Sequence, residues 1–296
     1  MSEKPHKAGF VSIIGKPNVG KSTLMNVMVG ERLSIITSKA QTTRHRIMGI
    51  LNGDDFQIVY SDTPGIIQPK YELHQSMMRF VSASLEDADV ILFVTDIYEK
   101  HDEEEIIKRL QHVDAKIILL INKIDQATEE EVKEKIAYWG DHLKADQIIP
   151  ISALEKFNTD KVFAAILEYL PEHPAYYDKD ELTDKPERFF AAEIIREKIF
   201  LTYKKEIPYS CEVVIEEFKE DEAIIRMRAE IMVERNSQKG IVIGHEGKML
   251  KKVGTMARQE MEKFFAKQVH LDLYVRVQED WRSNPKALNK FGYNDL

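Results

Sequence analysis

The chain of 296 residues is 43% hydrophobic and 31% charged, a balance that predicts a soluble globular protein with room for two domains. It holds no run of 18 apolar residues, and its start, MSEKPHKAGF, lacks the apolar stretch of a signal peptide, so we expect neither a transmembrane helix nor a secretory leader. The single cysteine, Cys211, lies in a strand-like context, which favours a buried thiol in a cytoplasmic protein.

The net charge of −8 is distributed unevenly along the chain. Residues 236–290 carry 11 Lys or Arg against 6 Asp or Glu, which is +5 and leaves −13 for the remainder. A basic carboxyl-terminal part on an acidic chain indicates a module that binds a polyanion.

Strand-like and helical patterns alternate from residue 7 to about residue 170. This alternation predicts an α/β domain whose mainly parallel sheet is covered by helices on both faces. Ligands of such sheets bind at the carboxyl ends of the strands. The predicted strands are 10–15, 46–53, 55–62, 89–96, 116–122 and 147–152, and the predicted helices are 23–29, 72–86, 102–113, 129–138 and 160–169.

The first predicted strand leads into GKPNVGKS, residues 15–22, which fits the G-x-x-x-x-G-K-[ST] phosphate loop between a strand and a helix. Gly15 and Gly20 let the backbone approach a phosphate, and the N–H groups at the start of the helix attract the anion. We expect Lys21 to reach the β- and γ-phosphates and the Ser22 hydroxyl to bind Mg²⁺. The other predicted nucleotide contacts in this stretch are Lys16, Pro17, Asn18, Val19 and Thr23.

The polar segment 32–46, RLSIITSKAQTTRHR, connects the first helix to the second strand. A threonine hydroxyl from such a loop can complete a Mg²⁺ shell when a γ-phosphate is present, which would make the segment a switch that is released after hydrolysis. We choose Thr43 over Thr42 for this role. His45 is a candidate base, but a surface histidine is the favoured interpretation.

The tetrapeptide DTPG, residues 62–65, directly follows the third predicted strand. Asp62 is placed to hold Mg²⁺, often through water, and the Gly65 N–H can approach a γ-phosphate. Taken alone, the tetrapeptide also fits an ordinary turn. Behind a phosphate loop it predicts a second part of the same site, with Thr63 and Pro64 among its nucleotide contacts.

The stretch NKID follows the fifth predicted strand, and its Asp125 can accept two hydrogen bonds from the N1–H and amino group of guanine. Adenine offers no such donor pair, so this residue selects the base. A helix N-cap is the alternative for Asp125, and both roles can hold. The loop after the last strand offers a backbone N–H for guanine O6. The further nucleotide contacts predicted at these two loops are Asn122, Lys123, Ser152, Ala153 and Leu154.

In this order, the motifs GKPNVGKS, TTRHR, DTPG, NKID and SAL resemble the five guanine-nucleotide motifs of small GTPases. More narrowly, KAQTTRHRIMGI followed by DTPG is similar to the Era family of bacterial ribosome-assembly GTPases, which are TrmE–Era-like small GTPases with a C-terminal KH domain. The resemblance implies GTP or GDP with Mg²⁺ as the ligands. The residues it implies for the metal are Ser22, Thr43 and Asp62, and those for catalysis are Lys21, Thr43, Gly65 and Asn18.

Two features of this site bear on the rate of hydrolysis. Ile66 stands where Ras-like enzymes have a glutamine that orients the attacking water, so we expect slow intrinsic turnover. In relatives with this phosphate loop, an asparagine at the position of Asn18 can bind a monovalent cation. The resemblance therefore implies K⁺ as a further cofactor.

The second half of the chain begins with a proline-rich and acidic linker at residues 173–186. The order that follows is helix, strand, strand, helix, loop, helix, strand, and Gly244–Gly247 in that loop matches the GXXG loop that clamps a nucleic-acid backbone in KH domains. The order of these elements resembles a type II KH domain, whereas a plain turn between helices is the alternative. The predicted helices are 188–203 and 248–266, and the predicted strands are 210–218, 223–234 and 269–277.

The two central residues of this loop are His245 and Glu246, whereas in the family these residues are usually small or basic. A carboxylate that faces phosphates is unfavourable. Three lysines follow on the helix and can offset the negative charge of Glu246. Trp281 in the tail can stack on a base, but packing on the domain is favoured. The predicted RNA contacts are Gly244, His245, Glu246, Gly247, Lys248, Lys251 and Lys252.

The sequence thus predicts a GTPase domain at residues 1–172, a linker at 173–186 and a KH domain with its tail at 187–296. The resemblance implies binding to single-stranded RNA in the 3′ region of small-subunit 16S ribosomal RNA and a role in assembling that subunit. It also implies a monomer in the cytoplasm, with peripheral association at the inner face of the cell membrane as a further location. The alternative is a nucleotide-dependent scaffold whose basic domain binds protein or anionic membrane. An ATPase is disfavoured by NKID.

Overall fold

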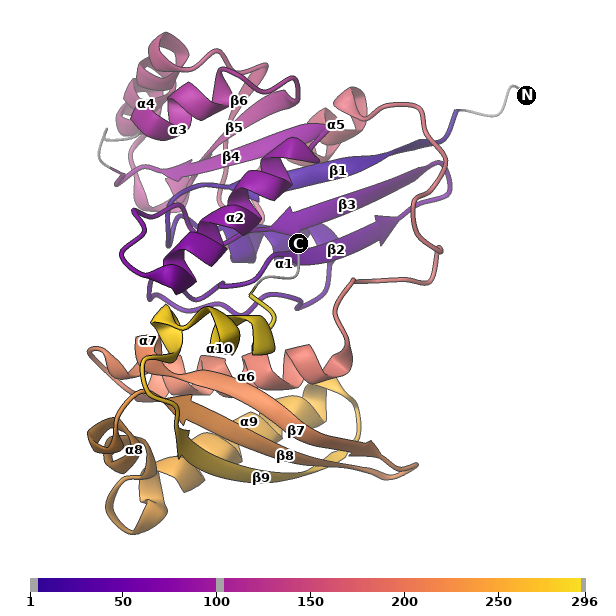
Figure 1. Ribbon diagram of the computed structural model, residues 1–296. Helices are drawn as coiled ribbons and strands as arrows, with labels where there is room; N and C mark the ends of the chain where they lie inside the picture. Colours follow the sequence, from indigo (N-terminus) through magenta and orange to yellow (C-terminus); the bar gives the residue numbers. More distant parts are fainter. Residues whose placement is uncertain (1–4, 100–103, 294–296) are drawn as a thin grey trace.

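The computed structural model describes residues 5–99 and 104–293 and shows two units, each with its own sheet (Figure 1). Helices α6 (Glu187–Thr202) and α10 (Pro285–Lys290) lie at the seam between the units. The first residues of the helix predicted at 102–113 and both ends of the predicted domains lie outside the described residues.

Six strands form the first sheet in the order β2-β3-β1-β4-β5-β6, and all neighbours are parallel except β2 and β3. The predicted mainly parallel sheet is therefore confirmed. The carboxyl ends of β1, β3, β5 and β6 lie along one edge, which brings the predicted motifs together. The strands are β1 (Lys7–Ile14), β2 (Ile47–Asn52), β3 (Phe56–Asp62), β4 (Val90–Asp96), β5 (Lys116–Asn122) and β6 (Gln147–Pro150).

Both faces of this sheet are buried because successive apolar side chains point to opposite sides of each strand. In β4, Val90, Leu92 and Val94 pack in one core with α1 and α5, whereas Ile91 and Phe93 pack in a second core with α2, α3 and α4. The helices of this unit are α1 (Lys21–Val29), α2 (Glu72–Glu86), α3 (Glu104–Leu110), the 3₁₀ turn η1 (Ile124–Gln126), α4 (Glu129–His142) and α5 (Thr159–Tyr169).

The second unit has a three-stranded sheet in the order β7-β8-β9, with β7 antiparallel and β9 parallel to β8. Helices α6 and α9 pack against it, and Ile195, Ile199, Val253 and Met261 form a core with the strands. The element order agrees with the prediction. The elements are α7 (Ile207–Ser210), β7 (Glu212–Glu220), β8 (Ile224–Val233), α8 (Asn236–Ile243), η2 (His245–Gly247), α9 (Lys248–Phe264), β9 (Gln268–Val277) and η3 (Trp281–Ser283).

The predicted linker, residues 173–186, lies along the edge of the first sheet. The Ile50 N–H donates to the Leu182 carbonyl over 2.8 Å, and Gln57 Oε1 accepts from the Tyr176 N–H over 2.7 Å. The connection is therefore fastened to β2 and β3 and is not a free spacer.

The carboxyl-terminal tail joins the two units through Trp281. This side chain is fully buried, and its Nε1 donates to the Ser210 carbonyl over 3.0 Å. It shares an apolar cluster with Leu73, Met77 and Phe80 of helix α2. The packing role that the sequence favours is thus confirmed.

The surface position expected for His45 is wrong. Its ring stacks on Tyr293 with the ring centroids 4.3 Å apart, and Phe189 meets it edge-on at 5.6 Å. Burial and the nearby cation Arg196 lower the pKa of His45 to about 3, so the ring is neutral at physiological pH. In contrast, the buried thiol expected for Cys211 is confirmed, and burial raises its pKa to about 12.

Candidate functional site

The turn between β1 and α1 accepts only glycine at two positions. Gly15 has a φ of 148°, and a Cβ there would lie 2.1 Å from the Val94 carbonyl oxygen. Gly20 has a φ of 102°, and its Cβ would lie 2.2 Å from Asn122 Nδ2. These approaches leave the backbone N–H groups of the loop and of the first turn of α1 around one concave space.

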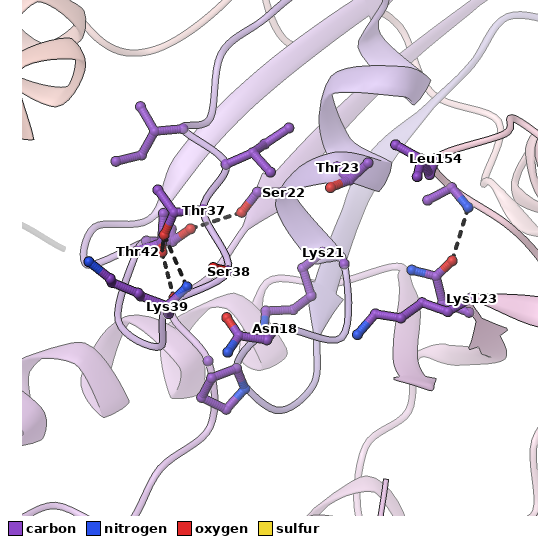
Figure 2. Close-up of a pocket in the computed structure, with 18 of the residues that line it drawn as sticks. Asn18, Lys21, Ser22, Thr23, Thr37, Ser38, Lys39, Thr42, Lys123 and Leu154 are labelled. Atoms are coloured by element: carbon purple, nitrogen blue, oxygen red, sulfur yellow. Dashed lines mark hydrogen bonds between the residues drawn. The ribbon is translucent and has the colours of Figure 1, made fainter. Parts of the chain in front are cut away.

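Lys21 is the first residue of α1 and extends back into this loop (Figure 2). Its ammonium group donates to the Gly15 carbonyl over 3.0 Å and to the Lys16 carbonyl over 2.7 Å. Burial lowers the pKa of Lys21 to about 8, against the opposing effect of Asp62. A buried cation with two neutral partners is arranged to receive an anion.

Three side-chain oxygens, from α1, the switch segment and β3, meet beside Lys21. Ser22 Oγ donates to Asp62 Oδ2 over 2.8 Å and lies 2.9 Å from Thr43 Oγ1, and Thr43 Oγ1 is 3.5 Å from Asp62 Oδ2. Asp62 Oδ1 is buried without a partner among the described residues, and burial raises the pKa of this carboxyl. One carboxylate with two hydroxyls fits Mg²⁺ that also takes phosphate oxygens as ligands.

The DTPG loop is held against the phosphate loop. Thr63 Oγ1 donates to the Ile13 carbonyl over 2.8 Å, and the Ile66 N–H donates to the Gly15 carbonyl over 3.0 Å. A Cβ on Gly65 would lie 2.7 Å from the ring of Pro17. The glycine therefore permits the close contact that brings the two loops together.

Asn122 fastens the other end of the site. Its Nδ2 donates to the Val19 carbonyl over 2.7 Å, and its Oδ1 accepts from the Ala153 N–H over 2.9 Å. The side chain thus ties the phosphate loop to the last loop of the sheet. The Ala153 N–H is thereby taken, whereas the neighbouring Leu154 N–H has no hydrogen-bond partner among the described residues.

Asp125 lies in η1 and is exposed at the wall of the cavity. The N-cap role considered for it is wrong, because Thr128 caps α4 and accepts a hydrogen bond from the Glu131 N–H over 3.3 Å. Lys123 is tied to Asp96 over 2.6 Å. The Asp125 carboxylate has no hydrogen-bond partner among the described residues, so it is available to a ligand.

Together these loops enclose a cavity of about 500 Å³ (Figure 2). The predicted residues in its wall are Pro17, Asn18, Gly20, Lys21, Ser22, Thr23, Thr43, Gly65, Asn122, Lys123, Asp125, Ala153 and Leu154, whereas Gly15, Lys16, Val19, Asp62, Thr63, Pro64 and Ser152 are not in the wall. Sequence reasoning missed Ile35, Ile36, Thr37, Ser38, Lys39, Gln41 and Gln126, and it passed over Thr42, which also lies in the wall. All but Gln126 lie in the predicted switch segment, so the assignment of that segment to the site could have predicted them.

The GXXG loop of the second unit turns sharply between α8 and α9. Gly244 has a φ of 72°, Glu246 of 53° and Gly247 of 75°, and a Cβ on Gly244 would lie 2.5 Å from the Met249 side chain. The Glu246 carboxylate pairs with the Lys248 ammonium over 2.9 Å. This ion pair offsets the charge that departs from the family pattern.

A groove of about 340 Å³ runs from this loop between α9 and β9. Only Gly247 and Lys251 of the predicted RNA contacts line it. A Cβ on Gly254 would lie 3.2 Å from Leu273, so the small residue keeps the helix close to the strand. The lining residues that sequence reasoning missed are Leu250, Gly254, Thr255, Arg258, Leu271 and Leu273. Their helical members recur at intervals of three and four, a spacing that was readable as one helix face.

The fold and the two sites define a P-loop GTPase domain followed by a KH domain. The family model for the 50S ribosome-binding GTPase matches residues 10–123, and the KH domain model matches residues 206–282. The predicted fold class, including the type II KH arrangement, is confirmed.

The chain is similar over nearly its whole length to proteins named GTPase Era. It is 48% identical to the one from Syntrophus aciditrophicus, with 98% of this chain and 96% of the relative covered, and 45% identical to the one from Geotalea daltonii, with 99% and 100% covered. A crystal structure of Era in complex with MgGDPNP and nucleotides 1506–1542 of 16S ribosomal RNA matches with a TM-score of 0.93, 41% identity and coverage of 97% and 99%.

A single-residue variant of Aquifex aeolicus Era, bound to GDP·AlF₄⁻, matches with a TM-score of 0.91, 42% identity and coverage of 97% of this chain and 99% of that one. The chain therefore belongs to the Era family of GTPases, and its reaction is the hydrolysis of GTP. None of its described helices is long and apolar enough to cross a bilayer.

Proposed function

We propose that this GTPase binds single-stranded RNA in the 3′ region of small-subunit 16S ribosomal RNA and acts in assembly of that subunit, with GTP·Mg²⁺ as its timer. The groove between α9 and β9, which opens from the GXXG loop, is the observation that carries the RNA part. Its wall combines apolar Leu271 and Leu273 with basic Lys251 and Arg258, which suits bases on one side and phosphates on the other. The Era relative crystallised with nucleotides 1506–1542 of 16S ribosomal RNA supports the choice of RNA.

In this proposal the phosphates lie on the backbone N–H groups of the phosphate loop, and the Lys21 ammonium bonds the β- and γ-phosphates. Ser22 and Thr43 would hold Mg²⁺ directly and Asp62 would hold it through water, and in that place the metal would neutralise charge on the phosphates. The Gly65 N–H points to the γ-phosphate, so the DTPG loop senses whether that phosphate is present.

At the base, Asp125 accepts from guanine N1–H and the amino group, and the Leu154 N–H donates to O6. Asn122 acts by holding the two loops, since both ends of its amide are bonded to backbone. The switch residues Ile36 and Lys39 form part of the cavity wall beside the nucleotide. The site therefore distinguishes guanine from adenine by pairing groups that adenine lacks.

Intrinsic hydrolysis is slow in this proposal, because Ile66 has no group that can orient water. Its side chain packs against the apolar core that includes α2, and it is not part of the cavity wall. Charge stabilisation in the transition state must come from another source. We propose that Asn18, which is exposed in the cavity wall with a φ of 67°, binds K⁺ beside the phosphates.

We expect GTP hydrolysis to run faster in K⁺ than in Na⁺, by a factor of about 10 or more, because a cation at this place supplies part of what an arginine finger supplies. The Asn18→Ala variant should lose this difference and keep its nucleotide affinity nearly unchanged. Initial rates at matched ionic strength in KCl and NaCl measure the effect. Equal rates of the parent protein in both salts would end the K⁺ hypothesis.

Gly247→Asp should weaken binding of a single-stranded 3′-terminal 16S oligoribonucleotide by about tenfold or more while GTP affinity stays the same. Gly247 has a φ of 75°, and the added carboxylate would repel the phosphates that the loop must admit. Fluorescence anisotropy with a labelled oligoribonucleotide measures the loss. Gly140→Asp is the matched control, since Gly140 is an exposed helical glycine of the other domain with open space around it.

The same variant separates this proposal from the scaffold alternative. Anionic phosphatidylglycerol vesicles should compete poorly with the oligoribonucleotide, because a lipid surface offers no single strand that fits the groove. Unchanged RNA affinity in a folded Gly247→Asp protein would favour the scaffold that binds protein or membrane. We further propose a monomer that acts in the cytoplasm, with peripheral contact to the inner face of the cell membrane as the second location to be tested.

A further inference from the structure

The switch segment, residues 32–46, is held at its beginning by its own domain. Asn26 of α1 accepts from the Leu33 N–H over 3.0 Å and from the Ser34 N–H over 2.9 Å, and its Nδ2 donates to the Ser34 carbonyl over 2.8 Å. The first part of the segment is therefore fixed to the helix that follows the phosphate loop. The part that carries Thr43 lies beyond this anchor.

That second part is held by the KH domain. Arg196, on helix α6, is almost fully buried, and its guanidinium donates to the Thr42 carbonyl and, over 3.4 Å, to the Gln41 carbonyl. Glu193 accepts from the same guanidinium over 2.6 and 2.5 Å. The carboxylate compensates the buried charge and fixes the plane of the group.

A second cation fastens the turn between the anchors. Lys39 donates to the Tyr203 carbonyl over 2.5 Å and to the Phe200 carbonyl, where α6 ends and its dipole attracts a cation. Thr42 Oγ1 donates to the Lys39 carbonyl over 2.6 Å and lies 2.6 Å from Thr37 Oγ1. The turn is thus closed on itself and fastened to α6.

We propose that Arg196 is a positioning residue for GTP hydrolysis, which the RNA-binding domain supplies to the GTPase site. By holding the carbonyls of Gln41 and Thr42, it sets the backbone from which Thr43 presents its hydroxyl to Ser22 and Asp62. The inference rests on the proposed metal-binding role of Thr43. A buried carbonyl that loses its donor must find another, and the segment would leave this conformation to do so.

The effect should depend on the nucleotide. Thr43 completes the site only when Mg²⁺ and a γ-phosphate are both present, whereas GDP relies on the phosphate loop and the base-binding loops. Loss of Arg196 should therefore weaken GTP binding and turnover and leave GDP binding alone. A residue that only holds the domains together would have no such selectivity.

The test uses the full chain with Arg196→Gln, Arg196→Lys, Thr43→Ala and Arg32→Gln. Arg32→Gln is the matched control because Arg32 lies before the residues that Asn26 anchors and outside the cavity wall, and it also bonds α6, through Glu197 over 2.5 Å, without touching residues 41–43. Affinities for fluorescent GDP and GDPNP and the kcat for GTP at varied Mg²⁺ are the readouts, with the melting temperature as a check on the fold.

Arg196→Gln should lower kcat by about tenfold to a hundredfold and raise the Mg²⁺ concentration needed for half-maximal rate, with GDP affinity changed by less than about twofold. Arg196→Lys should recover part of the loss, since a lysine can reach one carbonyl but not span two. Arg32→Gln should leave the ratio of GDPNP to GDP affinity unchanged. If Arg196→Gln does not fold, the test rests on Arg196→Lys, whose kcat should then lie below that of the parent protein.

The proposal is overturned if Arg196→Gln keeps the parent kcat and affinity ratio while Thr43→Ala lowers them, or if Arg32→Gln reproduces the effect of Arg196→Gln. If Thr43→Ala itself changes neither quantity, the metal-binding role of Thr43 is wrong and the positioning role falls with it. The two failures are therefore distinguishable by the threonine variant.

Discussion

Lys21→Ala is expected to lower the affinity for both GTP and GDP by a factor of about 100 or more, because charge-assisted bonds to two phosphates are lost. The fold should persist. In the nucleotide-free protein the Lys21 ammonium is buried against two carbonyl groups, so its removal relieves a desolvation cost and leaves no ion pair broken. Titration with a fluorescent nucleotide analogue and a melting curve measure the two quantities, with Lys133→Ala on the exposed face of α4 as the control.

The pH dependence of nucleotide binding gives a second readout of the same residue. Burial lowers the pKa of Lys21 to about 8, from 10.5 for a free side chain. Below pH 8 the empty site already holds the charged form, so affinity should be flat. Above pH 8 the empty site holds the neutral form, and binding must take up a proton, so affinity should fall by about tenfold per pH unit until the pH reaches the pKa that Lys21 has in the nucleotide complex.

The stability of the nucleotide-free fold should change with pH in the opposite direction to the nucleotide affinity. Between pH 8 and 10.5 the unfolded chain binds a proton at Lys21 that the nucleotide-free fold does not, so stability rises with pH in this window. Below pH 8 the fold bears the whole cost of the buried charge, about 3 kcal/mol. Lys21→Ala should lack both trends. Parent-like affinity in this variant would overturn the phosphate-loop assignment.

The motifs at the strand ends could be predicted because each depends on local chain chemistry. A glycine-bracketed loop between a strand and a helix is typical of phosphate binding, and the carboxyl ends of parallel strands lie at one edge of the sheet. For this reason the sequence predicted which loops would surround the cavity and that Thr43 would come from the switch segment. The roles of these residues toward nucleotide and metal remain predictions.

The seam between the domains could not be predicted, because its contacts join residues more than 150 positions apart. Arg44 is fully buried and donates to the Cys211 carbonyl over 2.8 Å and to Glu212 over 3.0 Å, yet in the sequence it is one basic residue of a polar loop. His45 gave the wrong expectation for the same reason. Its stacking partner Tyr293 belongs to the tail, which lies far from His45 in the sequence and meets the ring only in the folded protein.

Asp125→Asn should convert the site from guanine to xanthine nucleotides. A carboxylate at this place accepts from guanine N1–H and from the 2-amino group. Xanthine carries an oxygen at that carbon, so an amide can accept from N1–H and donate to the oxygen. We expect GTP affinity to fall by a factor of about 100 to 1,000 and XTP affinity to rise by a similar factor, since sites built around specific hydrogen bonds discriminate strongly.

The structure makes this substitution a clean test. The Asp125 side chain is exposed in the cavity wall, and Thr128 rather than Asp125 caps α4, so the change to asparagine breaks no packing and no cap. Asp141→Asn, an exposed change of the same charge on α4, is the control. Competition of GTP and XTP against a fluorescent GDP analogue gives both affinities in one titration. If the variant keeps its preference for GTP and gains no XTP binding, another group reads the base, and the Leu154 N–H at the opposite loop is the next residue to test.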